Sequence, residues 1–471
     1  MTVNPEEAMR PLLMAPEMLM FSAGLVALIA GSFLPRRRQW WVGVMAAAVQ
    51  VGVIGVAVVQ MAGPDQMAFE GAFSVDTATG VARIACAAGL VLIWAVAGAE
   101  MRASPRESET YALLMFSTSG VLILAGAEDL LLLVAGYFLA SIALYGLVGL
   151  VRSAAAAEAA MKAYLMGALF GILLMLGVTL LYGLTGATRY PQLAMTLGGA
   201  PAVAVAAGVV GVLAGLMFEA GGVPAHFWVP DAAQGANATA ATFLTTVPKI
   251  GALVALYRLT AALPDTLAWP VLIAVFAVAS MTLGNLAAYW QQDPRRLLGW
   301  STVSQVGYLL VPITVAGSSE LALPSLLFYL VGYTVTNIAA FAVTAALPGR
   351  RDLDSYRGLA RARPWLAGAL VVALLGLVGT PPTAVFIGKV TTAAAAWDGR
   401  YAWLAVVVFV NTLVSLFYYL RWIIPAFARP DEAGDADQTA AQHWPAGAAI
   451  LAAALSLLLG IIAGPVWQLV T

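Results

Sequence analysis

The sequence predicts an all-α, polytopic membrane protein with about fourteen transmembrane helices. Of its 471 residues, 62% are hydrophobic and only 10% are charged, whereas a soluble domain carries about 25% charged residues. Apolar segments close to the length that crosses a bilayer, about 20 residues, recur from one end of the chain to the other. These two observations exclude a soluble enzyme, a disordered chain and a coiled coil.

The expected helices follow one another with short connections, so residues 1–471 are predicted to form one membrane domain. Each apolar segment must be helical, because lipid offers no hydrogen bonds to an unpaired backbone. In chain order the predicted helices are 12–34, 40–62, 77–99, 110–126, 128–150, 160–184, 199–222, 238–262, 267–290, 297–317, 320–347, 364–397, 401–428 and 444–469.

Two of these segments are interrupted. The stretch 215–230 reads GLMFEAGGVPAHFWVP, and the stretch 376–389 reads GLVGTPPTAVFIGK. A proline has no N–H and frees the carbonyl four residues before it. Broken helices at corresponding places in two halves of a chain are typical of ion paths in transporters. A packing kink is the alternative for either one alone.

The basic residues predict the orientation. With the N-terminus outside, sixteen of them fall in inside loops and four in outside loops, a distribution that obeys the positive-inside rule. The outside set is Arg10, Arg189, Arg258 and Arg400; the inside set is Arg36, Arg37, Arg38, Arg102, Arg106, Arg152, Lys162, Arg295, Arg296, Arg350, Arg351, Arg357, Arg361, Arg363, Arg421 and Arg429.

Several classes of site are unexpected in this chain. A net charge of −1 gives no electrostatic reason to bind nucleic acid. One cysteine, Cys86, excludes disulfides within the chain, and two distant histidines, His226 and His443, lack metal-site spacing. No nucleotide-binding glycine motif occurs. Any redox cofactor is therefore expected in a partner.

Four ionisable residues are predicted inside the membrane, and we interpret them as a proton relay. Such groups cost roughly 2.5–3.5 kcal/mol each to insert, so they are kept when paired, hydrated or used. They are Lys249 beside Pro248, Lys389 after the second interruption, Glu219 just before the first and His226 just after it. For each the alternative is a structural role: an ion pair, a neutral acid or a satisfied histidine.

The chain resembles a known family along most of its length. The segments that carry the resemblance include GVPAHFWVPDAAQGA, TFLTTVPKIGAL, RRLLGWSTVSQVGYLL and DLDSYRGLARARPWL followed by GTPPTAVFIGK. They are similar to the antiporter-like membrane subunits of bacterial NADH-quinone oxidoreductase, the respiratory complex I, and among these to the subunit N family.

This resemblance implies two inverted five-helix repeats, at about 110–262 and 267–428, each with one broken helix. It implies proton translocation through buried charges, driven by quinone reduction elsewhere in the complex. Lys249 matches the family's lysine in helix 8, and Lys389 matches its lysine in helix 12. NAD, FMN, iron–sulfur clusters and quinone are expected in partner subunits. The expected partners are other membrane subunits of complex I, and the expected location is the bacterial inner membrane.

Two positions depart from the family pattern. Phe138 stands where helix 5 usually carries glutamate, and Glu219 stands where helix 7 usually carries lysine. In one interpretation the relay is rearranged, with Glu219 paired to Lys249. In another this is a divergent paralogue with a mainly structural role. A cation/proton antiporter subunit, working without electron transfer, is a further alternative.

Overall fold

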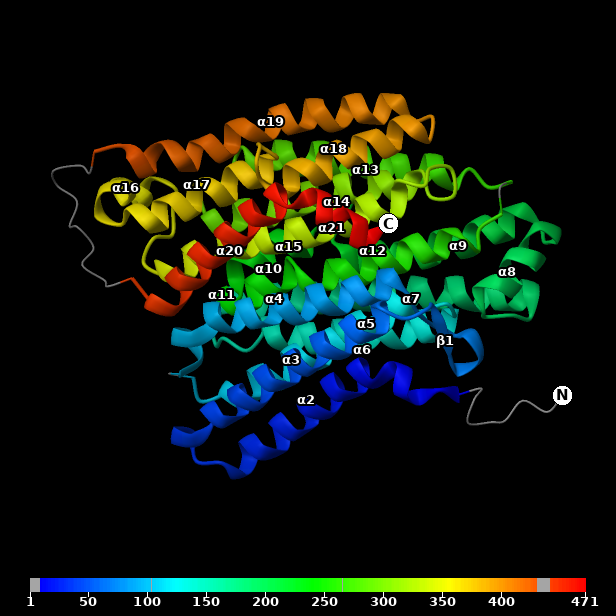
Figure 1. The fold of residues 1–471 in the computed structure, drawn as a ribbon, viewed down its shortest axis with the longest axis horizontal. Coiled ribbons are helices and arrows are strands. Elements are labelled where there is room, and N and C mark those ends of the chain that lie inside the picture. Colours follow the sequence, from blue (N-terminus) through cyan, green and yellow to red (C-terminus); the bar gives the residue numbers. More distant parts are fainter. Residues whose placement is uncertain (1–8, 103, 265, 430–440) are drawn as a thin grey trace.

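The computed structural model describes residues 9–102, 104–264, 266–429 and 441–471. Most helices run side by side along the long axis of the molecule (Figure 1). Among the described residues, twelve helices are long and apolar enough to cross a membrane. The predicted all-α, polytopic fold is therefore confirmed. The predicted count of fourteen is compatible with these twelve together with two further membrane-length segments, described below, and it stays a prediction.

The first part of the chain consists of helices and one small hairpin. Its strands β1 and β2 pair antiparallel, with Met67 opposite Ser74. The elements are α2 (Ala15–Phe33), α3 (Trp40–Met61), β1 (Gln66–Ala68), β2 (Phe73–Val75), α4 (Thr77–Arg102), α5 (Glu107–Gly126), α6 (Leu130–Val148), α7 (Ala154–Thr185), α8 (Tyr190–Thr196), α9 (Ala202–Ala220), α10 (Trp228–Gly235), α11 (Ala238–Leu244) and α12 (Val247–Thr260).

In the second part of the chain, all regular elements of the described residues are helices. Its elements are α13 (Trp269–Ala288), α14 (Pro294–Thr314), α15 (Ala322–Ala346), α16 (Leu359–Ala362), α17 (Pro364–Val378), α18 (Ala384–Asp398), α19 (Ala402–Phe427), α20 (His443–Ile461) and α21 (Ala463–Val470). The two segments outside the twelve are α14, whose buried face carries several polar residues, and the broken pair α17–α18.

Both predicted interruptions are present, between α9 and α10 and between α17 and α18. The structure adds a third that we did not predict, because the segment 238–262 is broken between α11 and α12. Pro248 has no N–H to bond the carbonyl of Leu244, and the N–H of Lys249 bonds the carbonyl of Thr246 at 3.1 Å instead. Lys249 therefore lies in the first turn of a new helix rather than in the middle of one.

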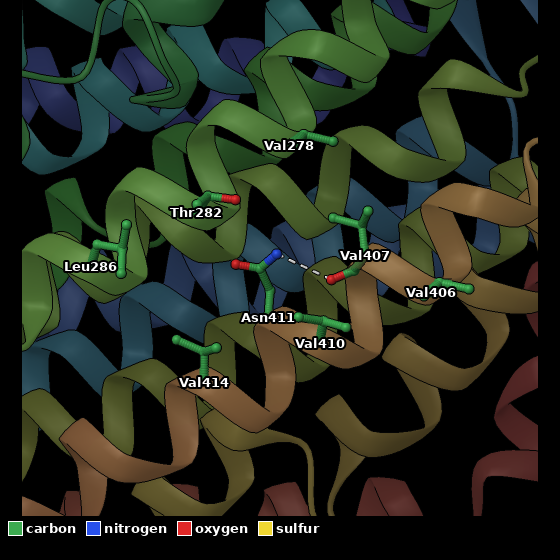
Figure 2. A pocket seen from close by; sticks show the side chains of 8 residues that line it. All are labelled: Val278, Thr282, Leu286, Val406, Val407, Val410, Asn411 and Val414. Atoms are coloured by element: carbon green, nitrogen blue, oxygen red, sulfur yellow. Dashed lines mark hydrogen bonds between the residues drawn. The ribbon is translucent and has the colours of Figure 1, made fainter.

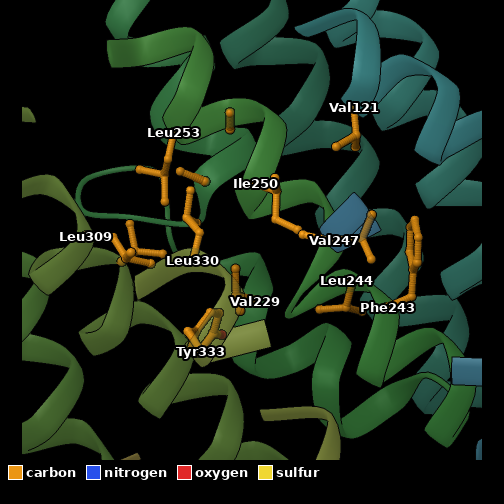
Figure 3. Close-up of a cluster of buried hydrophobic side chains, with 14 of the residues drawn as sticks. Val121, Val229, Phe243, Leu244, Val247, Ile250, Leu253, Leu309, Leu330 and Tyr333 are labelled. Carbon is orange, nitrogen blue, oxygen red and sulfur yellow. The ribbon is translucent and has the colours of Figure 1, made fainter. Parts of the chain in front are cut away.

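The interior of the molecule is built around α12 and α15. The most apolar stretch of the α11–α12 segment is completely buried, and that of α15 is 89% buried. Leu244, Val247 and Ile250 of the broken segment belong to the same buried hydrophobic cluster as Leu330 and Tyr333 of α15 (Figure 3). The break that precedes Lys249 thus lies in the apolar core.

The outer surface has a different character. A shallow groove of about 300 Å³ runs between α13 and α19 (Figure 2). It is lined mostly by valines, and its buried amide, Asn411, bonds the carbonyl of Val407 at 3.1 Å. No ionisable side chain lines this groove, so it is not a candidate for the predicted relay.

Candidate functional site

The end of α9 forms the first part of the candidate site. Gly221 ends the helix with φ of +77°, a conformation that favours glycine. The N–H groups of Gly221 and Gly222 both bond the carbonyl of Met217, at 2.9 and 3.0 Å. The chain then leaves the helical path, so the carbonyl of Glu219 does not meet the N–H that a continuing helix would present to it.

Lys249 occupies this helix end. Its Nζ donates a hydrogen bond of 3.1 Å to the main-chain carbonyl of Glu219, and the side chain is fully buried. The ammonium also lies 5.0 Å from the ring centroid of Trp228. A helix C-terminus carries a partial negative charge, and an aromatic face attracts a cation. The fold therefore supplies Lys249 with carbonyl and aromatic partners.

Lys389 has the same kind of surroundings at the second break. Its Nζ donates to the carbonyl of Val378 at 2.9 Å and to that of Leu377 at 3.3 Å, both at the end of α17. The ring centroid of Tyr308 lies 3.9 Å from the ammonium. Two buried lysines are thus placed alike, each at the C-terminus of an interrupted helix and each against an aromatic ring.

The glycine at each break leaves room for the lysine. A Cβ atom built on Gly221 would lie 3.2 Å from Nζ of Lys249, and one built on Gly379, whose φ is +90°, would lie 2.9 Å from Cδ of Lys389. Glycine therefore serves twice at these positions, since it adopts the left-handed backbone and lets the lysine approach the helix end.

Glu219 is buried, but its carboxylate is held differently from our expectation. Ser141 of α6 donates a hydrogen bond of 2.6 Å to Oε2. Among the ion pairs of the described residues, none joins this carboxylate to Lys249, which bonds the main-chain oxygen of Glu219 instead. The two side chains therefore form no direct ion pair in this structure, and the rearranged relay stays a prediction. Oε1 has no hydrogen-bond partner among the described residues.

Aromatic side chains fill the place where the family acid was expected. The Phe138 and Tyr137 rings meet edge to face with centroids 5.4 Å apart, and Phe218 lies 6.4 Å from Tyr137. Ser141 lies one turn after Phe138 on the same helix. α6 and α9 therefore meet through a hydrogen-bonded pair in which the acid lies on α9 and a hydroxyl lies on α6.

His226 is buried in the turn between α9 and α10, away from the contacts described above. Its ring lies 4.3 Å from that of Phe227 and 5.5 Å from that of Trp300, centroid to centroid. In the part of the chain that the structure describes, its Nδ1 has no hydrogen-bond partner. No described hydrogen bond joins His226 to Glu219 or to either lysine, so its part in a relay stays a prediction.

Several partners at the site had no signal in the sequence. Trp228, Tyr308 and Ser141 reach the charged residues from helices that only the folded chain brings near. The structure also pairs Arg83 with Glu17, at 2.8 Å and almost fully buried. Among the described residues, no group of three or more histidine, cysteine or acidic side chains could hold a metal ion.

Comparison with known proteins identifies the family of this chain. A family model described as NADH:quinone oxidoreductase/Mrp antiporter, TM, matches residues 127–415. The NADH-quinone oxidoreductase subunit N of Mycobacterium sp. (strain JLS) is 93% identical over 469 residues, covering 100% of both chains. The chain belongs to the NADH-quinone oxidoreductase subunit N family. The predicted resemblance is confirmed.

Further relatives of this subunit N chain extend the comparison. The subunit N 1 of Streptomyces griseus subsp. griseus is 48% identical over 467 residues, or 98% of each chain. A chain of respiratory complex I from Thermus thermophilus with bound Aureothin is 29% identical, with a TM-score of 0.83, over 96% of this chain and 98% of that one. A chain of the Mrp complex from Dietzia sp. DQ12-45-1b, 22% identical with a TM-score of 0.84 over 97% and 96%, shares the fold.

Proposed function

We propose that this chain is a proton-translocating, non-redox subunit of an NADH-quinone oxidoreductase. The observation that carries the proposal is the matched placement of Lys249 and Lys389, each buried at the end of an interrupted helix. A buried lysine can release its proton, whereas a guanidinium stays charged. The two lysines act as proton-exchange groups, and Glu219 is a third such group.

The freed carbonyls explain how the charge is tolerated in lipid. An ammonium in the membrane must be paired, hydrated or hydrogen-bonded. At each break it meets main-chain carbonyls and the face of an aromatic ring. Either protonation state can use this pocket, since a neutral amine still donates hydrogen bonds to the same oxygens. His226 is assigned to proton entry, on the grounds of its burial in the turn beside Glu219's helix.

The surrounding assignments rest on family membership. The two repeats are placed at about 110–262 and 267–428, one lysine site in each. The chain resides in the bacterial inner membrane with its N-terminus on the periplasmic side, in contact with other membrane subunits of complex I and with lipid. NAD, FMN, iron–sulfur clusters and quinone belong to partner subunits, where quinone reduction drives the transfer.

The experiment that tests the proposal removes each ammonium and keeps an unbranched side chain of similar length. The whole complex carrying Lys249→Met or Lys389→Met is reconstituted into vesicles, and protons moved per NADH oxidised are measured. We expect that ratio to fall in both variants. The control is Lys162→Met, because Lys162 is 46% exposed and pairs at the surface with Glu158 and Asp231. An assembled complex with an unchanged ratio in both core variants refutes the proposal.

A second function is favoured by Phe138 and Glu219, since the family's acid and lysine are absent from those places. In that function the chain is a cation/proton antiporter subunit, or a paralogue that completes a complex without moving protons itself. A sodium gradient imposed on the same vesicles separates these cases. Proton movement driven by sodium, without NADH, is expected only of an antiporter.

A further inference from the structure

Two hydrogen-bonded rungs between α14 and α15 lie between the two lysine sites. In one rung the hydroxyl of Tyr329 donates to Oε1 of Gln305 at 2.7 Å. In the other the hydroxyl of Tyr333, which has a single proton, lies within hydrogen-bond distance of both Oγ1 of Thr302, at 3.1 Å, and the carbonyl of Thr245. We call Tyr329, Gln305, Tyr333 and Thr302 the ladder. All four are buried, so neither rung competes with water.

One end of the ladder reaches Lys389. Nε2 of Gln305 donates to the carbonyl of Leu377 at 2.8 Å. The same carbonyl accepts a hydrogen bond from Nζ of Lys389, at 3.3 Å. Gln305 and Lys389 therefore share one acceptor at the end of α17, and a change in one bond alters the other.

The other end of the ladder reaches the break before Lys249. The hydroxyl of Tyr333 donates to the carbonyl of Thr245 at 2.6 Å. That carbonyl would accept from the N–H of Lys249 in a continuous helix, but this N–H bonds Thr246 instead. Asn337 adds a hydrogen bond of 3.1 Å to the side chain of Thr245. The second half of the chain thus holds the backbone that positions Lys249.

The register on α15 makes this connection possible. Tyr329, Tyr333 and Asn337 are spaced four residues apart and therefore lie on one face of the helix. On α14, Thr302 and Gln305 are three residues apart and face them. The part of α15 with this face packs against both broken segments: Gly388, next to Lys389, lies against Tyr329, and the hydroxyl of Tyr333 bonds the carbonyl of Thr245 at the α11–α12 break.

We propose that the ladder couples the protonation state of Lys389 to the geometry of the α11–α12 break, and so to the position of Lys249. This inference rests on the proposed function of the lysines. Hydrogen bonds to an ionised donor are roughly twice as strong as neutral ones. When Lys389 loses its charge, its hydrogen bond to the Leu377 carbonyl weakens, and the existing bond from Gln305 to the same carbonyl strengthens. The shift passes through Tyr329 along α15 to Tyr333 and Thr245.

The ladder transmits position and does not carry the proton. Its links include the amide of Gln305 and the main-chain carbonyls of Leu377 and Thr245, none of which releases a proton of its own along the chain of bonds. Tyr329, Tyr333 and Gln305 are therefore positioning residues that act through Thr245 and Leu377.

Amide hydrogen exchange in the intact, resting complex tests this coupling. The exchange of residues 243–250 is followed by mass spectrometry in four forms: unchanged, Lys389→Met, Tyr333→Phe and the double variant. Because each substitution removes buried hydrogen bonds of its side chain, we expect each alone to accelerate exchange at the break by roughly two- to tenfold. We expect the double variant to exchange no faster than Tyr333→Phe alone. An effect of Lys389→Met that is absent, or equally large in both backgrounds, overturns the proposal.

Two further variants separate coupling from general loosening. Thr336→Val also removes a buried hydroxyl from α15, but this hydroxyl pairs with Ser456 of α20 at 2.6 Å, so the response to Lys389→Met is expected to persist. Tyr329→Phe breaks the rung to Gln305 and is expected to abolish the response to Lys389→Met. This variant replaces Tyr333→Phe in the experiment if the complex with Tyr333→Phe fails to assemble. The exchange is read without turnover. Unchanged proton stoichiometry in both lysine variants would refute the proposed function, whereas additive exchange would refute only the ladder.

Discussion

Ser141 holds the carboxylate of Glu219 across the contact between α6 and α9, at 2.6 Å and out of reach of solvent. The two residues are 78 positions apart in the sequence. A carboxylate buried in a membrane protein needs such a partner, and the aromatic side chain of Phe138 cannot supply one. The hydroxyl one turn further along α6 takes that role.

Ser141→Ala is expected to reduce both stability and proton stoichiometry. It leaves Oε2 of Glu219 without its partner, while Oε1 already has none among the residues described by the structure, and this costs about 1–3 kcal/mol. Thermal unfolding of the purified complex and the ratio of protons to NADH oxidised measure the two effects. Ser117→Ala removes another buried hydrogen bond, to the carbonyl of Ala140, and is expected to spare the stoichiometry. An unchanged ratio of protons to NADH in Ser141→Ala would show that the bond between Ser141 and Glu219 has no part in proton transfer.

Gly379→Ala is expected to displace Lys389 and lower proton transfer. The new methyl group would lie 2.9 Å from Cδ of the lysine, and the backbone at φ +90° disfavours alanine by about 1 kcal/mol or more. The matched control is Gly368→Ala on the same helix, where a Cβ meets nothing within 4 Å. Equal proton ratios for the two variants would contradict the close approach of Lys389 to this helix end.

The buried pair of Arg83 and Glu17 is expected to stabilise the packing of α2 against α4. Arg83→Met leaves the carboxylate of Glu17 buried and unpaired, so the loss of stability should be about 3–5 kcal/mol. The double variant Arg83→Met with Glu17→Gln should lose less than Arg83→Met alone. Unfolding temperatures of the four forms make a double-mutant cycle, and purely additive losses would argue against the pairing.

The cluster around Arg258 predicts a pH dependence. Arg258 bonds Asp76 at 2.6 Å and Glu128 at 2.8 Å. Burial alone would raise the pKa of Asp76. The positive charge of Arg258 and the hydrogen bonds from Arg258, Thr79 and Ser74 outweigh this effect and hold that pKa below its usual 3.8. The stabilisation from Asp76 is therefore complete above pH 3.8 and is lost as the pH falls through the lower folded pKa.

Asp76→Asn should accordingly unfold at a lower temperature than the unchanged protein at pH 7, and the difference should narrow below pH 3.8. The exposed Asp65→Asn serves as the control, with no difference expected at either pH. A difference for Asp76→Asn that is constant with pH would mean that its charge is not what stabilises the cluster.

The sequence predicted the features that depend on composition and on local chain chemistry. Glycine and proline marked the ends of α9 and α17, because the lack of a Cβ or of an N–H changes the backbone conformation and hydrogen bonding at that same position. It did not predict the break before Lys249. Pro248 was visible, but the loss of helix there also depends on Tyr333 and Asn337, which hold the freed backbone from a distant helix.

The pairing of charges shows the same division. The sequence placed Glu219 and Lys249 in the membrane, and on that basis we expected their side chains to pair. The fold instead directs Lys249 to the main-chain oxygen of Glu219 and gives the carboxylate to Ser141. Which oxygen an ammonium meets depends on helix rotation and packing to within an ångström, and a single sequence does not contain that information.

By itself, then, the sequence determined that this chain spans the membrane many times, where two of its helices break and that two lysines lie among them. These features follow from hydrophobicity and backbone geometry, which act locally. Only the tertiary structure decided what each charge touches and that α15 joins the two breaks. Those contacts link residues as far apart as Tyr333 and Thr245, separated by 88 positions, and they exist only once the helices have packed.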